Sequence, residues 1–519
     1  MSADFLDRSH SVAKPGFSRW LVPPAALCIH LSIGQAYAFS VFSKPMSMLI
    51  GITDPVAGDW KIPNIGWIFS LAIVFLGLAA AFGGKWVERV GPRKSMFAAA
   101  LLFSGGLLIA GAGVALHLLP LVFLGYGVVG GMGLGIGYIS PVSTLIKWFP
   151  DRPGLATGTA IMGFGGGALV GAPLANYLMN TFKGPNSVGV WQTFVAMAAI
   201  YAVFMFAGAF GYRVPPNNWT PEGWVKPAAS GMVTSRSVDL KDAHKTPQFW
   251  LIWTVLCLNV SAGIGVLAVA SPMLQEIFGG NLIGRTGAAL GSLDAGDKTA
   301  VATVAAGFVG LLSLFNIGGR FFWASMSDKI GRKVTYAIFF ALGIALYAGA
   351  PWAASVGGQA LFVGAFCIIL SMYGGGFATV PAYLADVFGT QFVGAIHGRL
   401  LTAWSTAGIL GPLVVTQITL FQRDSGVPPG QVYNRTLYIL ASFLVVGFVA
   451  NLLVRPVAEK WYMPASAEGV VGTAVAAGGS FGIGRGGFSI PALLAWLCVG
   501  IPIAFGVKFT LDNALVLFR

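Results

Sequence analysis

The chain has 519 residues, of which 56% are hydrophobic and only 9% are charged, and its mean hydropathy is +0.77. This composition is typical of a polytopic α-helical membrane protein and excludes an ordinary soluble domain. The formal net charge of +13 does not indicate nucleic-acid binding, because the basic residues cluster in short loops between apolar segments. We therefore expect the lipid bilayer as a partner, and no nucleic acid.

Taken in chain order, the apolar segments predict twelve spanning helices, because each is close to the ~20 residues needed to cross a bilayer. They run over residues 20–42, 63–83, 96–117, 119–146, 154–180, 190–211, 249–273, 301–326, 335–355, 359–385, 395–421 and 435–454. The predicted organisation is a six-helix half at 1–213, a cytoplasmic central loop at 214–247 and a second six-helix half at 248–455.

Two further regions follow the twelfth segment. Residues 456–489 are rich in Ala, Gly and Ser toward their end, which predicts a flexible linker. Residues 490–519 contain the apolar run Ile490 to Phe509, which is long enough to span as a thirteenth helix. The alternative is a helix that lies at the membrane interface.

The distribution of Lys and Arg predicts the orientation of the chain. The loops that follow segments two, four, six and eight are richer in these residues than the loops on the opposite side. We therefore expect a multi-pass protein of the inner (cytoplasmic) membrane, with its N-terminus in the cytoplasm.

Enzyme signatures are missing from the sequence. The four cysteines lie within apolar stretches and form no CxxC pair, and the chain has no HExxH or P-loop motif. We expect no metal, no cofactor and no enzymatic activity.

The two halves carry a repeated loop. Gly84 to Lys94 follows segment two, and Ala324 to Lys333 follows segment eight, with an acid, a following base and a glycine at matching offsets. The repeat is typical of a duplicated six-helix unit. We predict that the charged residues of these loops gate the protein by latching neighbouring helix ends: Glu88, Arg89, Arg93, Asp328 and Arg332. Glycines also repeat at i+4 in two segments, which predicts close helix packing: Gly127, Gly131, Gly135, and Gly163, Gly167, Gly171.

Arg320 is the most informative single residue. It lies in the stretch Val304 to Met326, which otherwise has no charge, and a helix would place it ~12 Å from Asp328, the acid just beyond the end of that stretch. The guanidinium is therefore expected near the bilayer midplane, where charged residues usually face a water-filled path or a ligand. No acid stands one helical turn away, since Asn316 and Ala324 occupy those positions. An anion-binding arginine is favoured over one with a purely structural role.

These features resemble known carriers. The repeated loop resembles that of the major facilitator superfamily, with Glu88 where the first copy usually has Asp. Two runs, Tyr37 to Phe42 and Tyr138 with Lys147 to Gly158, are similar to the oxalate/formate antiporter family. The resemblance covers about residues 18–455, and the last helix is similar to a small single-helix subunit of some such carriers. It implies a twelve-helix major facilitator fold, here with a fused extra helix.

The resemblance also implies a site for a small carboxylate. In that family an arginine of helix eight, a lysine of helix eleven and several aromatic residues line a central cavity. The residues of this chain that match the arginine and the aromatic positions are Arg320, Tyr37, Tyr138, Tyr373 and Phe377. The lysine is absent, and Trp404 stands in its place. Asn316 and Asn259 are in turn similar to positions of bacterial monocarboxylate carriers.

The missing lysine bears on the substrate. A dianion would leave one carboxylate unpaired in a low-dielectric cavity, whereas a monoanion needs only one cation. We therefore expect a monomeric secondary carrier of small organic anions, with formate, lactate or pyruvate preferred. Transport would proceed by anion exchange or by proton symport, with His30 as a possible proton site. The alternatives are oxalate/formate exchange proper and a carboxylate sensor that does not transport.

Overall fold

The protein is almost entirely helical in a computed structural model. The structure describes residues 3–216, 219–224, 232–234, 236–464 and 490–514. Within these residues the only extended pairing consists of three isolated β-bridges. Thirteen helices are long and apolar enough to cross a membrane, so the predicted all-α membrane fold of twelve spans and one more is confirmed. Residues 465–489 of the expected linker lie outside the described residues.

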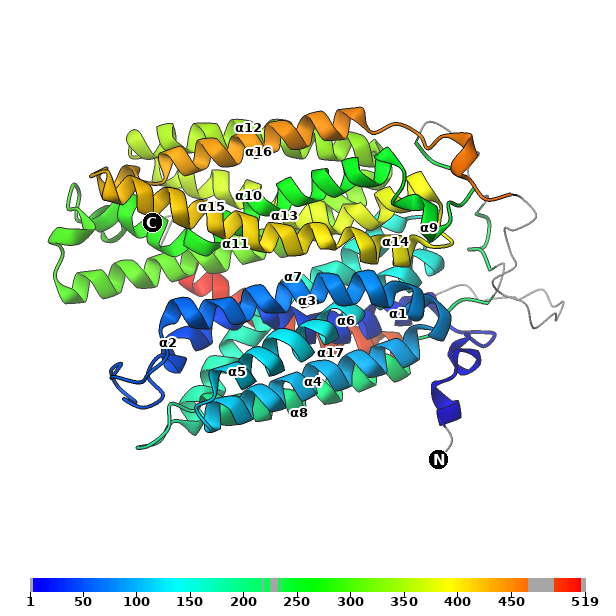
Figure 1. The fold of residues 1–519 in the computed structure, drawn as a ribbon, viewed down its shortest axis with the longest axis horizontal. Helices are drawn as coiled ribbons and strands as arrows, with labels where there is room; N and C mark the ends of the chain where they lie inside the picture. Colours follow the sequence, from blue (N-terminus) through cyan, green and yellow to red (C-terminus); the bar gives the residue numbers. More distant parts are fainter. Residues whose placement is uncertain (1–2, 217–218, 225–231, 235, 465–489, 515–519) are drawn as a thin grey trace.

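The chain up to Gly211 forms the first group of spanning helices (Figure 1). Its long helices are α1 (Val22–Gly34), α3 (Ile62–Val90), α4 (Pro92–Ala115), α6 (Gly131–Trp148), α7 (Pro153–Phe182) and α8 (Val190–Gly211). Two spans are composite. The first continues from α1 through η4 (Gln35–Phe42) and α2 (Ser43–Met46), and the fourth begins with α5 (Leu119–Val122) and η5 (Phe123–Gly130).

The second group begins at Pro247 and lies beside the first (Figure 1). A short helix, α9 (Leu240–Ala243), precedes it. Its long helices are α10 (Pro247–Phe278), α11 (Ala295–Ile330), α12 (Arg332–Ser355), α13 (Gln359–Phe388), α15 (Thr402–Asp424) and α16 (Asn434–Leu453), and the short α14 (Val393–Leu400) leads into α15. We call the groups α1–α8 and α10–α16 the first and second halves.

The repeated loops form matching turns in the two halves. α3 ends and α4 begins at Gly91, and α11 ends and α12 begins at Gly331. Both glycines have a positive φ, of 84° and 86°, which residues with a Cβ rarely adopt. The glycine of the loop motif is therefore required by the backbone in both copies.

The two glycine rows pack helices together within the first half. A Cβ on Gly135 of α6 would lie 2.2 Å from the carbonyl oxygen of Leu76 in α3. A Cβ on Gly167 of α7 would lie 2.3 Å from the carbonyl carbon of Gly34 at the end of α1. Because neither row lies between the halves, both hold the first half together as a rigid unit.

The halves meet along two seams. In one, α7 packs against α11 and α13, and in the other, α3 packs against α14 and α15. Small residues again allow close approach, since a Cβ on Gly398 would lie 2.3 Å from the carbonyl oxygen of Ala80, and one on Gly154 would lie 2.1 Å from that of Ala324. These seams must open and close if the halves move against each other.

The last helix, α17 (Ile490–Ala514), packs against both halves. It contacts α11 on one side and α7 and α1 on the other. A Cβ on Gly310 of α11 would lie 2.9 Å from Thr510 Cγ2, and one on Gly506 would lie 2.7 Å from Leu169 of α7. It therefore follows the seam between α7 and α11, and its opposite face presents large apolar side chains, among them Leu493, Leu497 and Phe505.

This placement predicts a specific disulfide. A Cβ on Gly310 would lie 3.7 Å from Thr510 Cβ, close to the ~3.8 Å that disulfides prefer. With the four native cysteines replaced by alanine, Gly310→Cys with Thr510→Cys should cross-link on oxidation. A protease site inserted between residues 465 and 489 would then leave the cleaved C-terminal fragment attached on a non-reducing gel. In the control pair, Gly310→Cys with Gly500→Cys, the fragment should be released, since nothing lies within 4 Å of a Cβ at Gly500. Release from the first pair would contradict the placement.

Candidate functional site

Arg320 lies in α11 with no exposed surface. Its Nε donates to Asn316 Oδ1 at 2.9 Å, and its Nη1 donates across the seam to the carbonyl oxygen of Ile161 in α7 at 3.2 Å. Its Nη2 has no hydrogen-bond partner among the described residues, and none of the ion pairs found among them includes Arg320. Because a buried charge without a counter-charge is costly, this guanidinium favours an anionic occupant.

Glycine makes room for this side chain. A Cβ on Gly165 of α7 would lie 2.6 Å from Arg320 Nε. Phe377 of α13 lies on another side, with its ring centre 5.3 Å from Arg320 Cζ, at cation–π distance. The guanidinium is thus held between the two halves by contacts that leave one of its nitrogens unused.

Six aromatic residues from both halves surround this position, and we call them the central aromatic cluster. The first half contributes Tyr37 (η4), Tyr138 (α6) and Phe164 (α7), and the second contributes Tyr373 and Phe377 (α13) and Trp404 (α15). Trp404 is at the centre, with ring-centre distances of 4.5 Å to Phe377, 5.2 Å to Phe164 and 5.4 Å to Tyr138. The hydroxyl oxygens of Tyr37 and Tyr373 lie 3.3 Å apart and join the halves directly.

Several buried polar atoms of this region are unpaired. Tyr138 Oη and Trp404 Nε1 have no hydrogen-bond partner among the described residues, as is also true of Arg320 Nη2. A Trp N–H and an Arg N–H can only donate, and a Tyr hydroxyl can donate. Since buried donors are rarely left unpaired, the arrangement is suited to a small ligand that carries acceptor oxygens.

The asparagines expected at the site have different surroundings. Asn316 accepts from Arg320 and positions its guanidinium. Asn259 of α10 packs on α13, where a Cβ on Gly376 would lie 2.5 Å from Asn259 Oδ1. That oxygen has no hydrogen-bond partner among the described residues.

His30 is fully buried and packs within the first half. Its Nδ1 lies 2.5 Å from the carbonyl oxygen of Ala160, its Nε2 lies 3.2 Å from that of Tyr138, and its ring stacks on Tyr138. These contacts suit a residue that holds α1, α6 and α7 together, and a role for His30 in proton transfer stays a prediction.

Two residues near the cluster were missed by the sequence reasoning. Phe164 belongs to the cluster, and its only signal is that it stands alone within the run Gly163 to Gly167. His397 of α14 is 1% exposed, its ring centre lies 5.9 Å from that of Tyr138, and both ring nitrogens lack a hydrogen-bond partner among the described residues. The segment Val393 to Leu400, in which His397 and Arg399 are the only polar side chains, gave no reason to single it out.

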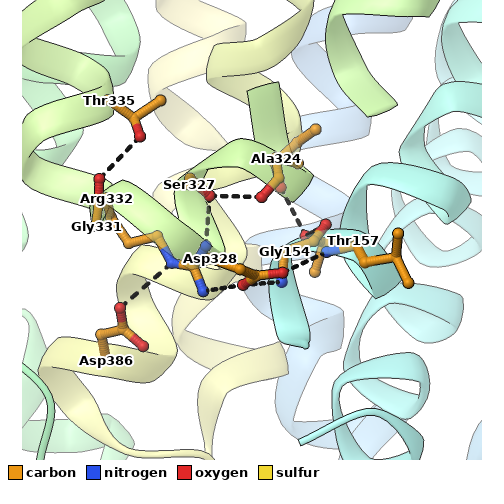
Figure 2. Close-up of polar contacts among 11 residues, drawn as sticks. Gly154, Thr157, Ala324, Ser327, Asp328, Gly331, Arg332, Thr335 and Asp386 are labelled. Atoms are coloured by element: carbon orange, nitrogen blue, oxygen red, sulfur yellow. Dashed lines mark hydrogen bonds and ion pairs between the residues drawn. The ribbon is translucent and has the colours of Figure 1, made fainter. Parts of the chain in front are cut away.

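At one end of the bundle, Asp328 joins the two halves (Figure 2). Its carboxylate accepts from the backbone N–H of Gly154 at 2.9 Å and of Leu155 at 3.0 Å, in the first turn of α7. Arg332 pairs with Asp328 and, at 3.3 Å, with Asp386 of α13. A carboxylate at a helix N-terminus is stabilised by the unpaired N–H groups and the helix dipole. We call this arrangement the Asp328 latch.

Among the described residues, the first copy of the loop makes no equivalent bond across the seam. Glu88 pairs with Lys147 of α6 at 3.3 Å, and Arg93 donates to the carbonyl oxygen of Phe5 at 3.1 Å, both within the first half. Arg89 is exposed and lines a cavity. Of the five loop residues expected to gate the protein, Asp328 is the one that bonds directly from one half to the other.

A second ion pair fixes the loop between α6 and α7. Arg19 donates to both oxygens of Asp151, at 2.8 and 3.2 Å. Burial alone would raise the pKa of the Asp151 carboxyl, but hydrogen bonding and the positive charge of Arg19 outweigh it and lower the pKa below its usual value. Asp151 is thereby held ionised close to the start of α7, where the latch is formed.

A cavity of about 1910 Å³ opens at the same end. Charged residues of both halves line it, among them Lys85, Glu88, Lys147, Asp328, Arg332, Asp386 and Arg399. Neither Arg320 nor the central aromatic cluster is part of its lining. The cavity therefore ends before the candidate site, which is enclosed in this conformation.

Two six-helix groups that enclose a buried site, with a matching loop in each, define a membrane carrier. The sequence matches the family model of the Major Facilitator Superfamily over residues 17–412, and the chain belongs to that family. The oxalate:formate antiporter of Oxalobacter formigenes is 28% identical over 398 residues, which cover 76% of this chain and 83% of that protein. The resemblance to the oxalate/formate antiporter family is thus confirmed.

Two further proteins are similar. The apicoplast pyruvate carrier 1 of Toxoplasma gondii is 26% identical over 405 residues, which cover 69% of this chain and 70% of that protein. The solved structure of the fucose:proton symporter of Escherichia coli aligns with a TM-score of 0.57 and 12% identity, over 84% of this chain and 100% of that chain. At that identity the structural likeness shows the fold alone, and the fold and the family are those of transporters.

Proposed function

We propose that the protein transports small monocarboxylate anions, such as formate, lactate or pyruvate, by alternating access of its two halves. The observation that carries this proposal is the unpaired Arg320 Nη2 beside the unpaired donors Tyr138 Oη and Trp404 Nε1. One carboxylate oxygen accepts from Arg320 of the second half while the same ligand accepts from Tyr138 of the first half. A ligand must contact both halves to affect how the two halves are positioned.

The charge of the site supports a monoanion. Arg320 is the only Lys or Arg among the described residues that is fully buried, and Trp404 occupies the position where the similar family has a lysine. One negative charge neutralises one guanidinium. A dianion would retain a net charge in a low-dielectric site, at a cost that binding must offset. The pyruvate carrier among the similar proteins favours the same substrate class.

The unpaired arginine also bears on coupling. An empty site leaves the guanidinium without a counter-charge, so closure of both seams around it is costly, whereas closure around a bound carboxylate is not. This difference favours exchange of one anion for another over return of the empty carrier. We place the protein in the inner membrane as a monomer, with its N-terminus and the Asp328 latch on the cytoplasmic side.

A second candidate, oxalate/formate exchange proper, is favoured by the similarity to the Oxalobacter antiporter. A thermal-shift screen of the purified protein separates the two. Formate, lactate, pyruvate and oxalate would be added at equal ionic strength, with chloride and sulfate as controls. A ligand at one hundred times its Kd stabilises the folded state by about 2.7 kcal/mol. We expect the largest rise in Tm with a monocarboxylate. A rise with oxalate alone would favour the exchanger, and no rise with any carboxylate would contradict the proposal.

A further inference from the structure

His397 is placed between the halves, next to the candidate site. It belongs to α14, which packs against α3 and α6 of the first half. Its neighbours along the chain make that approach close, since a Cβ on Gly394 would lie 2.6 Å from Ser143 Cβ, and one on Gly398 would lie 2.3 Å from the carbonyl oxygen of Ala80. His397 is thus enclosed by the seam, and it precedes Trp404 by seven residues, about two helical turns.

Its contacts differ from those of His30. Both ring nitrogens of His30 lie beside backbone carbonyl oxygens. Both ring nitrogens of His397 are unpaired among the described residues, and its ring is next to Tyr138, whose hydroxyl is also unpaired. Arg320 is close enough to Tyr138 to interact with it electrostatically. Tyr138 therefore interacts with two basic side chains that lack full sets of partners among the described residues.

The charged groups around His397 make their ion pairs and hydrogen bonds with other residues, although Glu88 Oε1, which would lie 2.6 Å from a Cβ on Gly394, has no hydrogen-bond partner among the described residues. Those on α14 and on the helices and loops packed against it make these contacts: Glu88 of α3 with Lys147 of α6, Asp386 of α13 with Arg332, Asp242 of α9 with Lys245, and Arg399 of α14 with the carbonyl oxygen of Leu240 and with His244. No described carboxylate lies within ion-pair distance of His397. A positive charge on this imidazole would therefore need a counter-charge from a ligand.

We propose that His397 is a second, titratable anchor of the anion site, which stays neutral with a monoanion and takes up one proton when a dianion binds. The proton is supplied by the acid form of the buffer, which becomes its conjugate base, and adds to the unprotonated ring nitrogen, so that the charges of Arg320, imidazolium and dianion sum to zero. A monoanion needs no such proton, because Arg320 alone neutralises it. The choice between mono- and dicarboxylates thus depends on pH. This inference rests on the proposed carboxylate transport and refines its substrate range.

The test counts protons. Formate and oxalate are titrated into purified protein by calorimetry between pH 6 and pH 8, in two buffers with different ionisation enthalpies. We expect uptake of close to one proton per oxalate and none per formate. The Kd of oxalate should rise about tenfold per pH unit where His397 is neutral in the free protein. The reason is that uptake of one proton on binding changes Kd by about tenfold per pH unit. The Kd of formate should not change over the same range.

Three variants sharpen the result. His397→Asn should abolish proton uptake with oxalate, whereas His10→Asn, a matched change at an exposed histidine, should bind both anions and take up protons as the wild type does. His397→Lys should bind oxalate with a Kd that is independent of pH, because its charge is permanent. If His397→Asn does not fold, His397→Lys assigns the proton, because oxalate binding by that variant that still depends on pH would place the proton on another group.

Two outcomes would overturn the inference. Oxalate binding without proton uptake in the wild type would exclude a titratable anchor while leaving carboxylate transport intact. Proton uptake that persists in His397→Asn would assign it to another group. If neither formate nor oxalate binds the wild type, the proposed function itself fails, and the role of His397 fails with it.

Discussion

Arg320→Lys is expected to weaken carboxylate binding and to slow uptake strongly while the protein still folds. The guanidinium uses Nε for Asn316 and Nη1 for Ile161, and its Nη2, which has no partner among the described residues, is the nitrogen that we propose binds the ligand. A lysine ammonium has one nitrogen on a flexible stem and cannot make these three contacts in fixed directions. Loss of one hydrogen bond to a charged group costs about 1.5–3 kcal/mol, which is roughly ten- to 150-fold in affinity. Arg320→Ala removes the charge as well, and should lose binding entirely.

The measurement is uptake of radiolabelled formate or pyruvate into proteoliposomes preloaded with the same anion. Size-exclusion profiles and Tm values would establish that each variant is folded. Arg435→Lys is the matched control, because Arg435 is exposed at the start of α16, and it should transport as the wild type does. Uptake at the wild-type rate by both Arg320 variants would rule out this residue as the anion-binding group.

Much of the fold follows from local features of the sequence. Segment length and hydropathy are properties of each helix alone, so the thirteen spans could be predicted from them. The glycines of the repeated loops are likewise predictable, because a tight turn with positive φ at Gly91 and Gly331 is a local requirement. The break of the first span at Gln35 could not be predicted. It occurs where Gly34 packs so closely on α7 that a Cβ would lie 2.1 Å from the carbonyl oxygen of Phe164.

The candidate site was predictable only in part. A lone charge in an apolar stretch indicates burial whatever its neighbours, and Arg320 is indeed fully buried. The partners of that charge depend on which helices meet. From the sequence alone, Gly165 would be interpreted as a helix-packing glycine. Its position beside Arg320 Nε, which shows that it also leaves space for the arginine, is seen only in the structure. His397 is similar, because its burial comes from the approach of α14 to α3 and not from its own segment. The i+4 glycine rows predict an interface correctly, but the sequence does not say that each lies within one half.

Asp328→Asn is expected to open the seam between α7 and α11. The substitution keeps the shape of the side chain but removes its charge, and one of the two backbone N–H groups of Gly154 and Leu155 loses its carboxylate acceptor. A carboxylate at a helix N-terminus contributes about 0.3–1 kcal/mol, and up to ~2 kcal/mol when partly buried. A loss of 1–2 kcal/mol changes a two-state equilibrium by roughly five- to thirtyfold. The population with the latch end open should increase by such a factor.

Labelling of a buried cysteine reports this opening. Ala324→Cys, in a chain without its native cysteines, places a thiol in the seam, since Ala324 is fully buried and its Cβ would lie 3.0 Å from one on Gly158. A maleimide that cannot cross membranes should label it faster in Asp328→Asn than in the parent, in vesicles that expose the latch end. Glu88→Gln is the matched control, because Glu88 pairs with Lys147 inside the first half. Equal acceleration by both variants would mean that overall charge sets the rate, and no acceleration by Asp328→Asn would mean that the latch does not hold the halves together. If only Asp328→Asn accelerates labelling, the two copies of the loop differ in role. The copy with Asp328 joins the two halves, and the copy with Glu88 stabilises the first half alone.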